Sequence, residues 1–143
     1  MDVAIGCDHA GFDLKECLKK ELESMGMQVK DYGTYSKEST DYADYAHPVA
    51  QGIQNGDFAK AVLICGSANG ISMTANKYEG VRAAICWTKE IAVLAREHND
   101  ANILSLPARF IAPEQGVDIL KTFFDTAFEG GRHERRVNKI NCA

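Results

Sequence analysis

Two stretches of the chain place reactive residue types directly after an apolar run. Cys7 ends the first run and is followed by Asp8 and His9. Cys65 closes a later run and is followed by the glycine-containing turn at residues 66–70. In open α/β sheets, ligands bind beyond the carboxyl ends of the strands. If both runs are strands of one sheet, the two stretches are candidates for a single site.

Cys65 is the candidate base. It would lie where a buried strand meets the start of a helix, and the oriented amide groups and positive dipole end there favour a thiolate. A thiolate can remove a proton from carbon. The alternative is that Cys65 is the last small apolar residue of a buried strand, because free cysteine is commonly buried. That structural interpretation is kept for Cys7, Cys17 and Cys86.

The turn from Gly66 to Gly70 has the composition of an anion-binding loop. Its backbone N–H groups could bind a phosphate, or an oxygen that becomes negative during a reaction. No Lys-Ser or Lys-Thr pair follows the second glycine, so the spacing is not that of a nucleotide-binding P-loop. An ordinary turn at a helix start explains the same residues equally well.

Later residues supply a candidate acid and candidate phosphate ligands. His98 falls near the end of an expected helix, where the negative end of the helix dipole favours a protonated imidazole. Arg132 and Arg136 are four residues apart and share a helix face, and Arg109 follows an expected strand. Guanidinium groups can hold a phosphate dianion. The structural alternatives are a hydrogen-bonded histidine at a buried helix end and a solvated basic face.

The hydrophobic pattern predicts the elements that must position these residues. Short apolar runs predict strands, and the segments between them and after the last one carry apolar residues at helical spacing. In the last of these predicted helices, the apolar stripe comprises Val117, Leu120, Phe124 and Phe128. Strands that alternate with helices predict an α/β fold with a doubly wound parallel sheet. We expect a single domain over residues 1–143. The five runs that predict strands lie near residues 3–7, 27–31, 61–65, 81–86 and 102–106.

Composition limits the classes of function. An apolar share of 45% over 143 residues can bury one core, and a net charge of -4 disfavours general nucleic-acid binding, which needs a broad basic face. The five cysteines show no CxxC spacing, so we expect reduced thiols and no zinc site. No apolar run approaches the roughly 18 residues that span a bilayer, and the start lacks a basic flank. We therefore expect a cytoplasmic protein that binds neither membranes nor nucleic acid.

Several ordered motifs resemble ribose-5-phosphate isomerase type B, in the family shared with the galactose-6-phosphate isomerase subunits of the lactose pathway. The resemblance covers nearly the whole chain. Its motifs are GCDHAGF at 6–12, TDY at 40–42, ICGSANGISMTANK at 64–77, GVRAAIC at 80–86, REHNDANIL at 96–104 and GGRHERRV at 130–137.

The resemblance implies a Rossmann-like three-layer sandwich with a five-stranded parallel sheet and no metal or organic cofactor. It also implies a homodimer, sometimes paired into a tetramer, whose two active sites are shared across the subunit interface. Cys65 would move a proton between C2 of the aldose and C1 of the ketose, and His98 of the neighbouring chain would assist opening of the furanose ring. His133 would add to the phosphate site, and Arg135 would face away. The implied substrate-binding residues are Asp8, His9, Tyr42, Gly66, Ser67, Ala68, Asn69, Gly70, Asn99, Arg109, Arg132 and Arg136.

Three positions depart from the family pattern. The commoner turn is Gly-Thr-Gly-x-Gly, where this chain has Ser67 and Ala68, and the family's TDYP is TDYA, with Ala43. A branch of the family with a Gly-Ser-x-Asn-Gly turn lacks the cysteine and uses a glutamate after the second glycine. Here that position is Ile71 and Cys65 is present, which favours the thiolate route.

The leading prediction is a phosphosugar enzyme that interconverts D-ribose 5-phosphate and D-ribulose 5-phosphate. An alternative within the same class is isomerisation of a six-carbon phosphosugar, such as allose 6-phosphate or galactose 6-phosphate. A third hypothesis, of another class, is a non-catalytic sensor of a phosphosugar or nucleotide on the same fold.

Overall fold

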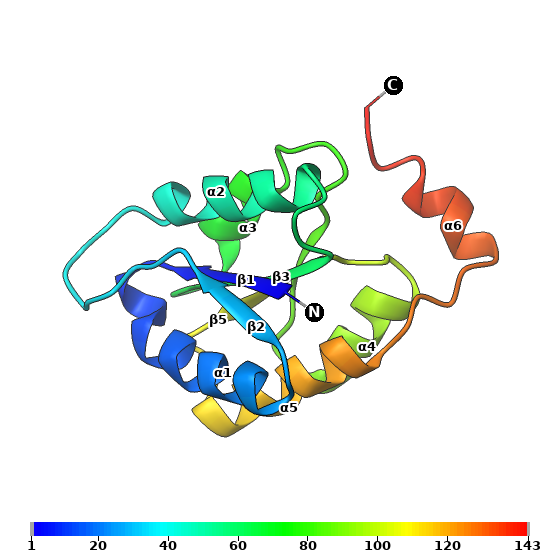
Figure 1. Ribbon diagram of the computed structural model, residues 1–143. Coiled ribbons are helices and arrows are strands. Elements are labelled where there is room, and N and C mark those ends of the chain that lie inside the picture. The colour runs from blue at the N-terminus through cyan, green and yellow to red at the C-terminus, as the bar shows by residue number, and fades with distance from the viewer. Residues whose placement is uncertain (1, 143) are drawn as a thin grey trace.

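A parallel sheet of five strands lies at the centre of the computed structural model, which describes residues 2–142 (Figure 1). The strands lie in the order β2-β1-β3-β5-β4. Every neighbouring pair is parallel, so all the carboxyl ends lie at one edge of the sheet. The bounds are β1 Asp2–Cys7, β2 Gln28–Asp31, β3 Lys60–Cys65, β4 Ala83–Ile85 and β5 Ile103–Pro107.

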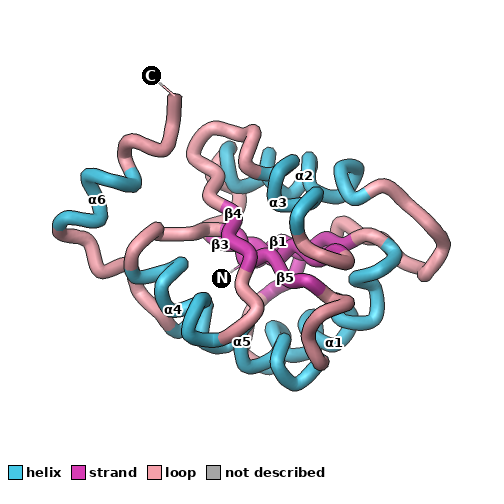
Figure 2. Tube along the Cα trace, turned by 180° about the vertical axis from the view of Figure 1, so that it is seen from behind, coloured by secondary structure: helices cyan, strands magenta, loops and turns pink. Residues whose placement is uncertain are grey.

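Helices cover both faces of the sheet, and this confirms the Rossmann-like three-layer sandwich. Helices α1, α4 and α5 pack on one face, and α2 and α3 pack on the other (Figures 1 and 2). Helix α6 stands apart, beyond the edge where the strands begin. No helix within residues 2–142 is long and apolar enough to cross a membrane. The bounds are η1 His9–Gly11, α1 Phe12–Ser24, α2 Tyr42–Gln54, α3 Asn69–Ala75, α4 Lys89–Glu97, α5 Pro113–Asp125 and α6 Arg132–Val137.

Two hydrophobic cores form because alternate residues of each buried strand face opposite sides of the sheet. Along β1, Val3 and Ile5 join the core with α1, α4 and α5, whereas Ala4 joins the core with α2 and α3. The same alternation separates two cysteines that end neighbouring strands. Cys7 faces the first core, and Cys65 faces the second.

Helix α5 differs from the sequence prediction in its end and in its buried face. It ends at Asp125, because Thr126 takes an extended conformation, so Phe128 lies outside the helix. Phe123 is fully buried, whereas Phe124 is only partly buried. The predicted stripe was therefore wrong by one position at this end, where two adjacent phenylalanines fit the helical spacing almost equally well.

Candidate active site

The carboxyl ends of β1 and β3 form a topological switch point. These neighbouring strands send the chain to opposite faces of the sheet, β1 to α1 and β3 to α3. Switch points of this kind are where α/β proteins bind ligands. Asp8 follows β1, and its backbone N–H donates to the Ile64 carbonyl at 3.2 Å, which places Asp8 beside the end of β3. The structure therefore brings the first two candidate stretches together.

Two other cysteines lie at the ends of strands: Cys7 ends β1, and Cys86 directly follows β4. Burial raises the pKa of the Cys7 and Cys86 thiols to about 12, so both stay protonated at neutral pH. Cys65 is 4% exposed and occupies the last position of β3, facing the core with α2 and α3. Of these three thiols, Cys65 is the one that ends β3 and directly precedes the turn at residues 66–70.

The turn after Cys65 presents free hydrogen-bond donors. Ala68 has a φ of +67°, a left-handed conformation that glycine adopts more easily. Ser67 Oγ accepts hydrogen bonds from the backbone and side-chain amides of Asn69, both at 3.2 Å, so its hydroxyl proton can still be donated. The backbone N–H groups of Ser67 and Ala68 have no acceptor within residues 2–142. Such donors can stabilise a negatively charged oxygen.

Arg109 lies against the same turn and comes from the neighbouring strand β5. Its backbone N–H donates to the Gly66 carbonyl at 3.1 Å. Its guanidinium approaches so closely that a Cβ on Gly66 would lie 3.2 Å from Nη1. Glycine at position 66 therefore permits a positive charge to lie directly over the end of β3.

His9 and Tyr42 complete this group of residues, and Thr40 helps to position them. The Thr40 backbone N–H donates to His9 Nδ1 at 3.1 Å, so a neutral His9 carries its proton on Nε2. Tyr42 is the first residue of α2 and packs its ring over Gly70. Sequence reasoning missed Thr40, whose signal was its place at the start of the TDY motif. Its hydroxyl is buried and has no hydrogen-bond partner in the part of the chain that the structure describes.

The remaining candidates lie at the opposite edge of the sheet, where the strands begin. Two of them follow α4 and precede β5, and the other two lie on α6, which extends from this edge (Figure 1). Within one chain they do not meet the residues around Cys65. We call them the His98 group: His98, Asn99, Arg132 and Arg136. The Cys65 group at the carboxyl edge comprises Cys65, Asp8, His9, Tyr42, residues 66–70 and Arg109.

A second histidine, His133 of α6, lies against His98. The two rings stack with their centroids 4.2 Å apart and their planes 11° apart. Burial, followed by the electrostatic effect of the neighbouring His98 and Arg132, lowers the pKa of His133. Its Nε2 has no hydrogen bond within the described residues and lies 3.7 Å from Glu129 Oε1. His133 is thus a buried, largely neutral partner of His98 at neutral pH.

His98, Glu129 and His133 are the described residues that come closest to a metal site. Their ligand atoms lie within 4.8 Å of one another. Stacked imidazoles, however, direct their nitrogen lone pairs side by side in parallel planes, whereas a metal ion needs lone pairs that converge. The nearby Arg132 and Arg136 also add positive charge that repels a cation. This geometry suits an anion better than a metal ion.

The profile of the Ribose/Galactose Isomerase family matches residues 3–140. The chain belongs to the ribose/galactose isomerase family. Ribose-5-phosphate isomerase B of Escherichia coli strain K12 is 42% identical over 140 residues, which cover 98% of this chain and 94% of that protein. The family resemblance carried by the sequence motifs is therefore confirmed.

Solved structures of the ribose/galactose isomerase family share this fold. A ribose 5-phosphate isomerase from Thermotoga maritima is 50% identical, with a TM-score of 0.94 and coverage of 97% of this chain and 96% of that one. Ribose-5-phosphate isomerase B from Mycoplasma genitalium, solved with bound ribulose-5-phosphate, is 39% identical, with a TM-score of 0.93 and coverage of 97% and 93%. The predicted enzyme class, an isomerase, is confirmed with the fold.

Within the ribose/galactose isomerase family, this chain has the thiol of Cys65 at the switch point. It lacks the glutamate that one branch carries in the first turn of the following helix. Ile71, at the position of the glutamate used by one branch, is fully buried in the core with α2 and α3. Ala43 lies in the first turn of α2, directly after Tyr42, where the family pattern has proline. Helix α2 therefore begins at Tyr42 without the proline.

Two glycine-to-alanine substitutions are expected to separate the site from the fold. A Cβ on Gly70 would overlap the ring of Tyr42, which is 44% exposed and can turn outward, so Gly70→Ala should weaken substrate binding with little loss of stability. A Cβ on Gly11 would lie 2.7 Å from Cγ2 of the buried Ile64. Gly11→Ala should therefore lower the free energy of unfolding by about 1–3 kcal/mol. Chemical denaturation and KM measurements check this contrast. If both variants lost the same free energy of unfolding, the expected contrast would be wrong.

Proposed function

We propose that this chain interconverts D-ribose 5-phosphate and D-ribulose 5-phosphate through an enediolate. The observation that carries the proposal is the position of Cys65 at the switch point, directly before a turn with free N–H donors. The relatives named above support the substrate, since the Escherichia coli protein is a ribose-5-phosphate isomerase B and the Mycoplasma genitalium structure holds ribulose-5-phosphate.

In the proposed reaction, His98 donates a proton to the ring oxygen of the furanose as the bond between C1 and that oxygen breaks. The C1 hydroxyl loses its proton to water, which leaves the aldehyde, and a proton from water restores His98. The Cys65 thiolate then removes the C2 proton, and the electron pair of that bond forms the C1–C2 double bond. The carbonyl oxygen on C1 becomes negative and is stabilised by the donors of the 66–70 turn. The hydroxyl proton on O2 moves to O1. The Cys65 thiol, which can exchange its proton with solvent while the enediolate is bound, donates a proton to C1. The carbonyl is now on C2, and the thiolate is restored.

The isomerisation of the aldose to the ketose needs no other reactant. One proton moves from C2 to C1 and one from O2 to O1, so the aldose and the ketose are isomers and no electrons are exchanged with a cofactor. The enzyme's task is to place base, acid, donors and phosphate site around one substrate. This is a task that side chains and backbone amides can perform alone.

The separation of the Cys65 group from the His98 group supports a shared active site. A site that contains both needs a second copy of the chain, because the groups lie at opposite edges of one sheet. A homodimer holds two such sites, each with the Cys65 group of one chain and the His98 group of its partner. Arg109, Arg132 and Arg136 hold the phosphate. The five cysteines are free, which suits the reducing cytoplasm.

The ranking of substrates tests this proposal. kcat/KM is expected to be highest on ribose 5-phosphate and about tenfold or more lower on allose 6-phosphate and galactose 6-phosphate, because the extra carbon must fit between base and phosphate site. Ala43 and Ala68 replace the family's proline and glycine beside the proposed sugar site, so six-carbon phosphosugars are kept as the second candidates. A higher kcat/KM on allose 6-phosphate would overturn the pentose assignment. Binding of all three sugars without turnover would favour a sensor.

A further inference from the structure

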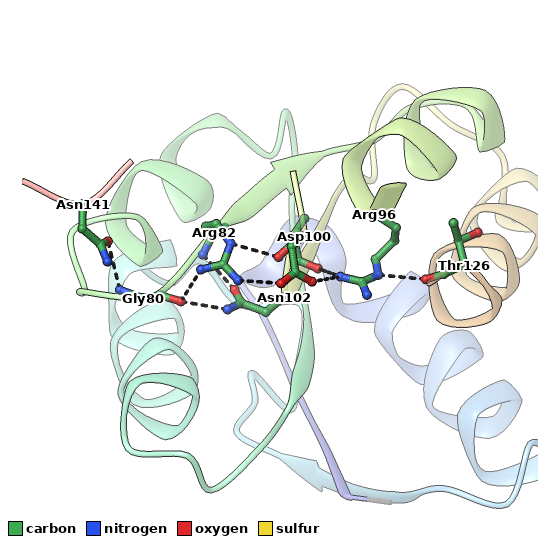
Figure 3. A network of polar contacts seen from close by, with 8 residues as sticks. Gly80, Arg82, Arg96, Asp100, Asn102, Thr126 and Asn141 are labelled. Atoms are coloured by element: carbon green, nitrogen blue, oxygen red, sulfur yellow. Dashed lines mark hydrogen bonds and ion pairs between the residues drawn. The ribbon is translucent and has the colours of Figure 1, made fainter. Parts of the chain in front are cut away.

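We propose that Arg96 and Asp100 are positioning residues for the His98 group, an inference that rests on the proposed function. Their side chains connect the turn that carries His98 and Asn99 to both ends of the C-terminal arm, residues 126–142 (Figure 3). The arm carries the two arginines assigned to the phosphate. The network therefore sets where the phosphate site lies relative to His98.

Arg96 joins the turn to the first end of the arm. Its side chain is 8% exposed, and its Nε donates to the Thr126 carbonyl at 3.0 Å. Its Nη1 donates to Asp100 Oδ1 at 2.9 Å and to the Ala101 carbonyl at 2.7 Å. The guanidinium carbon lies 5.7 Å from the centroid of the Phe123 ring. A planar, permanently charged fork can serve these separate acceptors at once, which the single ammonium of a lysine cannot do.

Asp100 extends the connection to the other end of the arm. Its Oδ2 lies 3.4 Å from Arg82 Nη2, and its backbone carbonyl accepts a hydrogen bond from Arg82 Nε at 2.9 Å. Arg82 Nη1 donates to the Gly80 carbonyl at 3.2 Å, and the Gly80 N–H donates to Asn141 Oδ1 at 3.3 Å. The network runs without a break from Thr126 to Asn141 (Figure 3).

The arm needs this fixation because little of it is buried. Of the six residues of α6, His133 alone is buried. Gly130 and Gly131, which precede α6, have φ values of +73° and +59°, a backbone conformation that glycine adopts more readily than residues with a side chain. If the ends of the arm were released, α6 could move relative to His98. Misplacement of a substrate-positioning group by about 1 Å can cost about 100-fold in rate.

Asp100 has a second role in the shape of the turn. Its φ is +47°, in the left-handed region that Asp and Asn tolerate better than other residues with a side chain. Its backbone N–H donates to the Arg96 carbonyl at 3.2 Å. Asparagine can keep this backbone conformation while it removes the negative charge that lies between two guanidinium groups.

Arg96→Lys and Asp100→Asn test the proposal. Calorimetric titration with inorganic phosphate is expected to give a Kd about tenfold or more above the wild-type value for both variants, and KM for ribose 5-phosphate should rise by a similar factor. Asp100 is 35% exposed, so its variant is expected to fold even if buried Arg96 proves intolerant. Arg135→Lys is the matched control. Arg135 is exposed on α6, has no polar partner in the described part of the chain, and its variant should change neither value.

The phosphate titration separates positioning from stability. A lower Tm with unchanged phosphate Kd and unchanged KM in both variants would overturn the proposal, because it would show that the network only stabilises the fold. Phosphate binding needs no turnover. A wild-type protein that binds phosphate but does not isomerise ribose 5-phosphate would contradict the proposed function and leave the comparison between variants valid.

Discussion

Replacing Cys65 with alanine is expected to lower kcat on ribose 5-phosphate by about 100-fold to 10,000-fold, the usual contribution of a general base. The substitution removes one sulfur atom at the end of β3 and leaves the donors of the following turn in place. The Kd for ribulose 5-phosphate should change by less than about threefold, because the base acts on the carbon-bound proton rather than on the phosphate. Steady-state turnover and calorimetric titration measure the two quantities separately.

Cys17→Ala is the matched control for this experiment. Cys17 is a half-buried, free thiol on α1, a helix that follows β1 rather than β3. Its variant should keep the wild-type kcat. If Cys65→Ala and Cys17→Ala turned over equally fast, Cys65 would have no part in the reaction.

Two inactive variants are expected to restore each other when their chains are mixed. Cys65→Ala lacks the base, and Arg132→Ala/Arg136→Ala should lose about 100-fold or more in kcat/KM because charge-assisted hydrogen bonds to phosphate are removed. If every site combines the Cys65 group of one chain with the His98 group of its partner, a mixed dimer has one intact site. Random pairing makes about half of the dimers mixed, so about a quarter of the wild-type activity should return.

Co-expression of the two chains with different affinity tags allows the mixed dimers to be purified and assayed. The control pairs Cys65→Ala with a chain that carries all three substitutions, a combination from which no intact site can arise. Sites that lie within single chains would leave the first mixture no more active than its separate components.

The sheet and the Cys65 group could be predicted because their signals are local. Each strand is centred on a short apolar run; Asp8 directly follows one such run, and Cys65 ends another. Chain order alone then places them at the carboxyl edge of a parallel sheet. The sequence already favoured Cys65 over Cys7, and the structure adds that the two thiols face opposite cores.

Contacts between distant segments could not be read from spacing. Thr40 contacts His9 across thirty-one positions of the chain, and Arg96 contacts Thr126 across thirty. The stacking of His98 on His133 likewise depends on the path that the chain takes after α5. Such contacts are set by the packing of whole elements, and no periodicity within a single element encodes them.

Exchange of carbon-bound protons with solvent tests the central claim most directly, since that claim is proton transfer at the carbon beside the carbonyl. Wild-type protein would be incubated with ribose 5-phosphate in D₂O and the sugars followed by NMR. Deuterium is expected at C2 of ribose 5-phosphate and at C1 of ribulose 5-phosphate, and Cys65→Ala should suppress both. Wild-type protein that binds the phosphosugar yet leaves both carbon-bound protons in place after prolonged incubation would contradict the mechanism.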